Sequence, residues 1–404
     1  MAAYPDQLFV DGAQFAQVAS TTTPGPGQFA VNDSTDQLIL GSDPTGHSVR
    51  ASDLSQAFVV SGQVTVRGFG VRRYATSLPQ IGTVYLGGSV GGDVLQNLVI
   101  SDNATQGLSF SASRTLVDHV TASANGMVGI HSNNSSGSVI QNSLISGNNT
   151  QHFNSAPAAA GIKVTRDDGL VIRNNDVVDN LGVNGIWTDV SVSNFAIVGN
   201  TVARNNGTYG IITELSDTGI VAGNAVSDAT RGYTAFDTGN VRVFNNVFSG
   251  NSVWDVGVWQ DARRNTGSNA TTIPWISRNI SVSNNVFASS TGMFQFYALD
   301  KATNTPASGM NLVVTGNVFG LFPSGPRMVG WGGSNNVQVT SYASPAALNT
   351  GVQVSWRNMQ VQLQAPAMAT PALTAAGTLI AVPLPADIAS QLGVAAGTAQ
   401  LGAF

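Results

Sequence analysis

The sequence predicts an all-β solenoid, in which short strands repeat along the chain and stack on one another. Three segments open with the same Gly-Ile pair and align without gaps: Gly161–Thr165, Gly185–Asp189 and Gly210–Glu214. Each is followed by a second apolar run, and the asparagines of these runs recur at steps of 25 residues (175 to 200) and 24 residues (200 to 224). Such a fixed period is typical of a repeat array in which each turn buries its apolar face against its neighbours.

The composition agrees with this class and argues against others. Glycine is abundant, with 45 residues, and charged residues make up only 10% of the chain, which suits many tight turns between strands. The formal charge of −5 and the presence of only two lysines, Lys163 and Lys301, argue against a nucleic-acid partner. No apolar run reaches the ~18 residues of a membrane span, and no basic segment leads into an apolar one as in a signal peptide.

The sequence pattern divides the chain into three parts. Residues 1–58 alternate short β-like runs with Asp-Gly and Asp-Pro turns, which predicts a small β-rich N-terminal cap or accessory segment. Residues 59–320 carry the repeats, and we expect them to form about ten coils. Residues 321–404 predict a C-terminal cap and tail. This last part contains a Pro/Ala/Thr-rich stretch at 365–384 and one short helix at Ala386–Leu392.

Asparagine recurs at one corner of the expected coils. Nine rungs carry asparagine or, once, aspartate: Asn97, Asp118, Asn142, Asn175, Asn200, Asn224, Asn246, Asn285 and Asn317. Asparagine tolerates the left-handed backbone of a corner, and its amide can bond the coils above and below. Asparagine as a simple turn marker is the alternative, but nine rungs in register favour a ladder. The longer steps (142 to 175, 246 to 285 and 285 to 317) predict inserted loops on one face.

These rungs and the Gly-Ile-x-x-[Asp/Glu] strands resemble the right-handed parallel β-helix (pectate lyase-like) superfamily. The resemblance covers about two thirds of the chain. It implies a parallel β-helix fold and a polysaccharide as the partner, because the superfamily includes pectate lyases, polygalacturonases and related polysaccharide-active proteins. For a bacterial protein of this kind, it also implies a location outside the cell or on the cell surface.

Alternation along the strands defines two columns of outward side chains. With the isoleucines assigned to the interior, Trp187 and Asp189 face outward, because successive side chains of a strand point to opposite faces. The first outward column reads Ser109, His131, Lys163, Trp187, Ile212, Ala235 and Trp259. The second reads Ser111, Asn133, Thr165, Asp189, Glu214, Asp237 and Asp261. The second column therefore ends in four consecutive acidic rungs.

The four acids of this column are the predicted catalytic residues. Stacked strands are ~4.8 Å apart, so neighbouring carboxyl groups cannot all ionise freely and one pKa must rise. A raised carboxyl beside an ionised one supplies the general acid and the base or nucleophile of glycosidic hydrolysis. We expect Asp189 and Glu214 to form the core pair, with Asp237 third and Asp261 last. Carboxyl groups on adjacent rungs have the separation found in retaining hydrolases, and those on alternate rungs approach the separation found in inverting ones. The sequence leaves both outcomes open. The alternative role of the acids is solubility.

The predicted substrate-binding residues surround this column: Trp187, Trp259, Lys163, Arg166, His131, Tyr233 and Arg263. An exposed indole stacks well on the apolar face of a sugar ring, and Tyr233 enters the same strands. Cations at both ends of the column suit an anionic sugar, because arginine is a common partner of carboxylates. The alternatives are packing under the insertion loops for the tryptophans, pairing with the acids for the cations, and a structural hydrogen bond for His131.

Three functions fit these residues. We expect first a glycoside hydrolase that acts on a polysaccharide without a cofactor or metal. The second is a lyase that cuts uronate chains by β-elimination, in which the acids hold calcium and Lys163 or Arg166 takes the α-proton. The third is a non-catalytic glycan-binding adhesin or tail-fibre protein on the same scaffold, because a fold does not dictate function. The sequence gives no oligomeric state.

Overall fold

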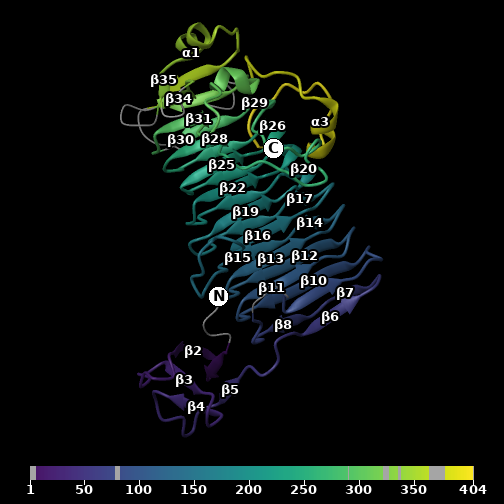
Figure 1. The fold of residues 1–404 in the computed structure, drawn as a ribbon, viewed down its shortest axis with the longest axis vertical. Coiled ribbons are helices and arrows are strands. Elements are labelled where there is room, and N and C mark those ends of the chain that lie inside the picture. Colours follow the sequence, from purple (N-terminus) through teal and green to yellow (C-terminus); the bar gives the residue numbers. More distant parts are fainter. Residues whose placement is uncertain are drawn as a thin grey trace.

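The computed structural model describes residues 6–77, 82–289, 291–321, 327–334, 338–363 and 378–403. It confirms the predicted all-β solenoid: short strands coil into a tall column, with a small separate sheet at one end and helix α1 at the other (Figure 1). Each coil contributes strands to three stacked columns in which neighbouring strands run parallel. Residues one coil apart in the sequence are therefore neighbours in space.

The first column forms the wall that carries the candidate site. Its parallel strands are β6 (Phe58–Ser61), β9 (Val84–Gly87), β11 (Gln106–Phe110), β13 (Val128–Asn133), β16 (Ala160–Thr165), β19 (Asn184–Asp189), β22 (Tyr209–Glu214), β25 (Arg231–Phe236), β28 (Trp254–Gln260), β31 (Phe294–Asp300) and β34 (Arg327–Gly332). Strand β35 (Val339–Tyr342) closes this wall and pairs antiparallel with β34.

The second and third columns form the other two walls. The second contains β7 (Thr65–Arg67), β14 (Val139–Gln141), β17 (Val171–Arg173), β20 (Ser193–Val198), β23 (Asp217–Ala222), β26 (Gly239–Phe244), β29 (Ile280–Ser283) and β32 (Leu312–Thr315). The third contains β8 (Gly70–Arg72), β15 (Leu144–Ser146), β18 (Asp176–Val178), β21 (Thr201–Ala203), β24 (Ala225–Ser227), β27 (Val247–Ser249), β30 (Val286–Ser289), β33 (Val318–Leu321) and β36 (Met359–Gln362). Two longer strands, β10 (Val94–Ser101) and β12 (Leu116–Ser123), run through both columns.

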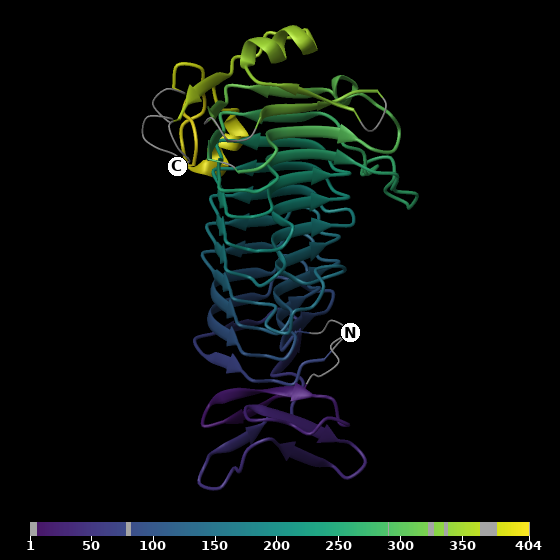
Figure 2. The same ribbon diagram turned by 90° about the vertical axis from the view of Figure 1, so that its left-hand side faces the viewer.

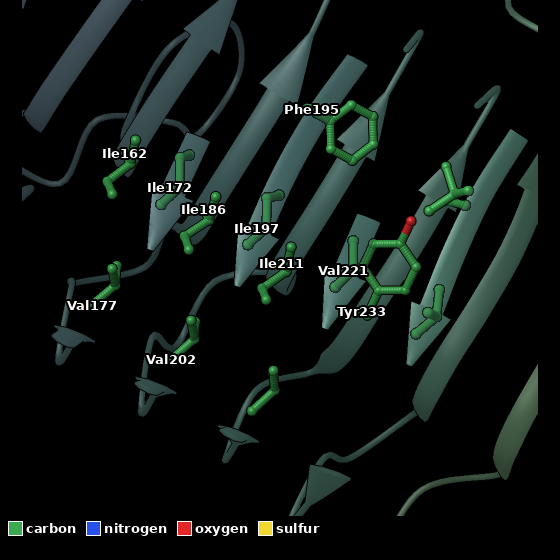
Figure 3. Packing of buried hydrophobic residues seen from close by; sticks show 14 of the residues in the cluster. Ile162, Ile172, Val177, Ile186, Phe195, Ile197, Val202, Ile211, Val221 and Tyr233 are labelled. Atoms are coloured by element: carbon green, nitrogen blue, oxygen red, sulfur yellow. The ribbon is translucent and has the colours of Figure 1, made fainter. Parts of the chain in front are cut away.

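Apolar side chains stack in vertical rows inside the solenoid. Ile162, Ile186 and Ile211 are register partners on adjacent strands of the first column, and all three are fully buried (Figure 3). Full burial of one such side chain contributes roughly 1.5–3 kcal/mol. Since each coil packs only against the coils next to it, these repeated contacts build a core that runs along the column and is not a single spherical one.

Buried asparagines form a ladder at the bend between the second and third columns. It runs through the predicted rungs from Asn175 to Asn317 and continues to Asn358. At a typical rung, the Oδ1 atom of Asn224 accepts hydrogen bonds from the backbone N–H and the Nδ2–H of Asn200, both at 2.9 Å. Each buried amide is therefore satisfied by the neighbouring coils, as buried polar groups require.

The ladder prediction was wrong for the three earliest rungs, Asn97, Asp118 and Asn142. Their places are taken by Leu98, Val120 and Ser143, which are in register with the later asparagines. The reason is conformational. Asn97 and Asn142 lie one residue earlier, at the left-handed corner (φ 55° and 52°), and Asp118 lies two residues earlier. Asparagine favours both positions, so its occurrence alone does not fix the register.

A second buried ladder, which the sequence reading missed, lies at the bend that leads into the first column. It runs through Asn103, Asn125, Asn148, Asn180 and Asn205, with amide-to-amide distances of 2.8–2.9 Å. The inserted loops also differ from expectation. Residues 149–159 precede β16, whereas 261–279 follow β28 and 301–311 follow β31, so the loops flank the first column on both sides.

The N-terminal sheet lies beneath the first coils (Figure 2). It consists of β1 (Leu8–Val10), β2 (Ala13–Val18), β3 (Gln28–Asn32), β4 (Gln37–Leu40) and β5 (Val49–Ala51). Its order is β4-β3-β2-β1-β5. The Nε2–H of Gln7 donates to the Asp102 carbonyl at 2.9 Å, and the Arg73 guanidinium lies 4.1 Å from the Phe9 ring centre. These contacts join the sheet to the solenoid.

The C-terminal part returns along the side of the column (Figure 1). Helix α1 (Pro345–Val352) follows β35, and a short 3₁₀ helix, η1 (Ala307–Met310), follows β31. The predicted helix is confirmed as α3 (Ala386–Leu392), which ends at Gly393 in a left-handed conformation (φ 69°). Its buried Ile388 packs on the second column. Most of the predicted Pro/Ala/Thr-rich stretch lies outside the described residues.

Candidate active site

The outer face of the first column carries two rows of side chains, as alternation predicts. The first row runs through Ser109, His131, Lys163, Trp187, Ile212, Thr234, Gly257, Tyr297 and Gly330. In the second row, Thr165 pairs with Asp189, and Glu214 is followed by Phe236, Trp259 and Leu299. Asp189 and Glu214 therefore occupy the row predicted for them.

The predicted register was wrong beyond Glu214. Glu214 pairs with Phe236, a step of 22 residues, and not with Asp237. Asp237 consequently falls in the turn after β25, and Asp261 falls just beyond the end of β28, two residues after Trp259. Ala235, expected outside, is fully buried in the interior. The physical reason is that this coil is shorter than its predecessors, and a slip of one residue reverses the face of every side chain that follows.

The prediction that Tyr233 binds substrate was also wrong, for the same reason. Tyr233 pairs with Ile211 and Val256 and is fully buried in the core (Figure 3). Its hydroxyl lies 2.9 Å from the Thr213 Oγ1 atom, which satisfies the polar end of the ring. Burial raises the pKa of the phenol. A ligand on the outer wall does not reach this side chain.

Trp187 lies in the outward row as predicted, but neighbouring side chains cover it. Only 7% of it is exposed, because the Lys163 ammonium lies 3.0 Å from the centre of its ring. The indole Nε1–H donates to Glu214 Oε2 at 2.9 Å. Trp187 therefore supports Lys163 and Glu214 from beneath and does not present an open stacking surface.

Lys163 and Asp189 form a buried ion pair beside this indole. The Nζ atom donates to Asp189 Oδ2 at 2.7 Å, and the backbone N–H of Val190 donates to Asp189 Oδ1 at 2.8 Å. Burial lowers the pKa of Lys163 to about 8, although Asp189 opposes the change. On the neighbouring strand, burial and the charge of Lys163 lower the pKa of His131 to about 4, so the imidazole is neutral near pH 7. Lys163 is thus a group that titrates close to neutrality.

Arg263 lies at the centre of three carboxyl groups. Its Nη1–H donates to Glu214 Oε1 at 2.5 Å, its Nη2 lies 3.0 Å from Asp237 Oδ2, and its Nε lies 3.0 Å from Asp261 Oδ2. Although burial opposes its charge, the hydrogen bonds with Glu214 and Asp261 raise the pKa of Arg263. The turn after β25 and the loop after β28 thus bring Asp237 and Asp261 back to Glu214. We call Glu214, Asp237, Asp261 and Arg263 the acid cluster.

The acid cluster separates the pKa values of two adjacent carboxyl groups. Burial, reinforced by the neighbouring Asp261 carboxyl, raises the pKa of Asp237 to about 8. Partial burial opposes the ionisation of Asp261, but hydrogen bonding to Asp237 and Arg263 outweighs it and lowers the pKa of Asp261. Asp237 is fully buried, whereas 34% of the Asp261 side chain is exposed. The cluster therefore holds one proton near pH 7, next to an accessible ionised carboxylate.

Hydrogen bonds fix Asp237 in this position. Its Oδ1 atom accepts from the Gln260 Nε2–H at 2.6 Å and from the Asp261 backbone N–H at 2.7 Å. Its Oδ2 atom forms an ion pair with Arg263, but the angles between the two groups are not those of a hydrogen bond. Burial of a carboxylate with one poorly bonded oxygen is costly, which favours the protonated form.

A partly exposed aromatic group continues the wall beyond the acid cluster. The Trp254 and Tyr297 rings stack 5.0 Å apart, and Trp259 packs 5.6 Å from Trp254. The Lys301 ammonium lies 4.6 Å from the centre of the Trp259 ring. The sequence reading identified Trp259 but missed Tyr297 and Lys301. Extending the alternation through β31 would have placed Tyr297 outward.

Arg166 lies apart from the acid cluster. It is exposed in the turn after β16, and its Nη1–H donates to Asn133 Oδ1 at 3.0 Å. In the described part of the chain, acidic and histidine side chains do not form a group of three or more arranged to hold a metal ion. Arg263 already neutralises the carboxylates that calcium would need, so the residues present do not fit a calcium site. No helix of the described residues is long and apolar enough to cross a membrane.

Comparison with known proteins places this architecture in a family. A family model described as the right-handed β-helix region matches residues 84–319, which is more than half of the chain. No curated protein matches. Among solved structures, XylC in complex with xylose aligns with a TM-score of 0.56 at 12% identity, over 89% of this chain and 67% of XylC.

Two alginate-epimerase structures align less closely. The A-module of the Azotobacter vinelandii mannuronan C-5 epimerase AlgE6 gives a TM-score of 0.46 at 12% identity, over 87% of this chain and 89% of that module. The periplasmic alginate epimerase AlgG gives 0.41 at 16% identity, over 70% of this chain and 61% of AlgG. At these identities the likeness is one of fold. Together with the family match, the coiled architecture shows that the chain belongs to the family of right-handed β-helix proteins.

Proposed function

We propose that the protein is a glycoside hydrolase that cleaves a polysaccharide lying along the first column, with the acid cluster as its catalytic centre. The observation that carries the proposal is the separation of pKa values within the cluster. Asp237 holds a proton near pH 7, while hydrogen bonding to Asp237 and Arg263 lowers the pKa of Asp261; Arg263 also pairs with Glu214. Two carboxyl groups with pKa values pushed apart are the arrangement that acid–base cleavage of a glycosidic bond requires.

The exposure of each group suggests its role. Asp261 is ionised and is the accessible end of the Asp237–Asp261 pair, so we assign it a proton relay: it takes the proton of the buried Asp237 and passes it to the leaving glycosidic oxygen, and solvent returns a proton to Asp237 after turnover. Glu214 accepts hydrogen bonds from Trp187 and Arg263, and 12% of its side chain is exposed. It is suited to take the proton of an attacking water or to attack the anomeric carbon itself. In either case water supplies the hydroxyl group of the new reducing end.

The aromatic group supports a sugar as the ligand. Trp259 and Tyr297 are partly exposed on the same wall, next to the acid cluster. Partly exposed aromatic rings provide flat apolar surfaces on which a pyranose ring stacks. A polysaccharide substrate also leads us to propose that the protein works outside the cell or on its surface, where such polymers occur.

One observation favours a second candidate function, β-elimination on a uronate chain. Lys163, with a pKa of about 8, titrates close to the range in which a base removes an α-proton. However, Lys163 is almost completely buried and is bound to Asp189, so it acts as a base only after this pair opens. We therefore rank the lyase second.

A glycan panel tests the proposal. Purified protein is incubated with plant, algal and bacterial polysaccharides, and both reducing ends and near-ultraviolet absorbance are followed. Release of reducing ends without near-ultraviolet absorbance supports the hydrolase. Near-ultraviolet absorbance from an unsaturated product supports the lyase. Binding without turnover would instead identify a non-catalytic glycan-binding protein.

Variants then locate the chemistry. D261N and E214Q should each lower turnover at least ~100-fold, the scale of general acid–base catalysis. The matched control is D179N, because Asp179 is an exposed acid paired with Arg204 at the end of β18, on the third column. Full activity in both D261N and E214Q would refute the assignment.

A further inference from the structure

A cavity lies beside the acid cluster and not over it. Its volume is about 910 Å³. One wall is the loop 265–275, which belongs to the insertion after β28, and the other is made of the stacked turns near residues 134–136, 166–168, 190–194 and 217–218. We call this space the side cavity. It falls in the size range of small-molecule binding sites, ~300–1,000 Å³.

The loop that forms the outer wall is firmly bound to its surroundings. The Asn265 Nδ2–H donates to Asn269 Oδ1 at 2.6 Å and to the Ile273 carbonyl at 2.8 Å. At the far end, the backbone N–H of Ser277 donates to Gln260 Oε1 at 2.6 Å. A loop with this many internal bonds holds the cavity open before any ligand arrives, which lowers the entropic cost of binding.

Trp275 occupies the inner edge of the loop in an unusual conformation. Its φ of 59° is left-handed, which is rare for a bulky residue. Its indole Nε1–H donates to Ser191 Oγ at 3.1 Å across the cavity, and the residue lines the space. Strain of this kind persists only where the surroundings impose it, and it concentrates at functional sites.

The lining of the side cavity is rich in neutral polar groups. Most of its residues carry hydroxyl or amide side chains, and its charged groups are Arg166 and three aspartates, so its net charge is negative. Asp168 already accepts from Ser193 and Asn194, whereas Asp217 Oδ2 has no hydrogen-bond partner among the described residues. A negative lining disfavours an anionic ligand. Amides, hydroxyls and one indole suit an uncharged ligand with many hydroxyl groups.

We propose that the side cavity is a second glycan-binding site, which takes a neutral segment or branch of an oligosaccharide. The cavity starts directly after Asp189, with Val190 and Ser191 in its wall, and its loop begins next to Arg263. A branched chain whose backbone lies along the first column therefore has a side branch within reach of the cavity. The glycan class rests on the proposed function, whereas the binding itself does not.

Binding without turnover tests the inference. Isothermal titration of the full chain uses xylohexaose, cellohexaose and mannohexaose as neutral probes, and hexagalacturonate as an anionic probe. S136W and S268W fill the cavity from its two walls, because both serines are exposed residues of its lining. T201W, on the exposed face of β21, places the same bulk on the third column as a control.

We expect at least one neutral probe to bind wild type and T201W equally, and to bind S136W and S268W at least ten times more weakly. D261N and E214Q should retain this binding. Equal binding to both cavity-filling variants, preference for the anionic probe, or no binding of any neutral probe would overturn the inference. The two proposals fail separately. Full turnover in D261N and E214Q with normal cavity binding would refute only the role of the acid cluster. Turnover that D261N and E214Q abolish, together with equal probe binding by wild type, S136W and S268W, would refute only the cavity.

Discussion

The proton held by Asp237 makes the stability of the fold depend on pH in a defined window. The folded protein keeps this proton up to about pH 8, whereas the unfolded chain loses it near the ordinary value of 3.8. The native state therefore binds more protons between these values, and its stability falls as the pH rises through them. The D237N variant removes this titration and keeps the carbonyl oxygen that accepts from Gln260.

The comparison with D237N isolates this contribution, because the other shifted groups, including Asp167, whose pKa burial also raises, are the same in both proteins. The pKa of His131 is lowered from 6.5 to about 4, so its contribution makes stability rise with pH between these values. The pKa of Lys163 is lowered from 10.5 to about 8, which makes stability rise with pH above about 8. Between about pH 6.5 and 7.5 the Asp237 contribution dominates, and one proton difference corresponds to about 1.4 kcal/mol per pH unit.

Denaturant unfolding at several pH values measures this effect. Wild type should lose about 1 kcal/mol between about pH 6.5 and 7.5 relative to D237N. D179N is the matched control, because it makes the same change at an exposed carboxyl and should keep the wild-type slope. Parallel curves for wild type and D237N would show that Asp237 is ionised in the folded state, and the proposed proton store would be lost.

Three further substitutions separate structural from chemical roles. Y233F should lower the free energy of unfolding by about 1 kcal/mol, because the hydrogen bond with Thr213 is lost, and should leave turnover unchanged. Lost turnover would contradict the interior role of Tyr233. N200A leaves the buried N–H of Asn175 without its acceptor, so it should destabilise the protein by about 2–4 kcal/mol in thermal unfolding. The control T201A, at an exposed residue, should change little, and equal effects of the two variants would refute the ladder. R263K keeps the charge but not the three-way geometry, and should reduce turnover at least ~10-fold; wild-type rates would show that one ammonium suffices.

The sequence predicted the coil, the direction of its strands and the first acidic rungs, because each depends on local alternation. Ile162, Ile186 and Ile211 identify the interior, and Trp187 and Asp189 then follow on the outer face. The same reasoning failed at the coil of Tyr233, where the chain is shorter, although Gly232 stands in register with Gly210 and opens the strand as in the earlier coils. In this strand Tyr233 and Ala235 both face the core, and a tyrosine in the place of isoleucine does not identify the interior row.

The acid cluster was not predictable from the column alone. Asp237 and Asp261 entered the prediction as members of an outward row, yet they reach Glu214 through a turn and a loop. Alternation applies only within a strand. It therefore does not predict the direction of side chains on residues that follow the last residue of the strand. The sequence also placed Arg263 at the end of the acid column, with pairing to the acids as an alternative, and its central position depends on the path of the loop.

The insertion after β28 links the two proposed sites physically. Its first residues bring Arg263 among the carboxyl groups, and Trp275, five residues before β29 begins, contacts the turn that follows Asp189. Gln260 joins both ends, because its Nε2–H donates to Asp237 and its Oε1 accepts from Ser277. The charge of the acid cluster and the shape of the side cavity therefore depend on one loop.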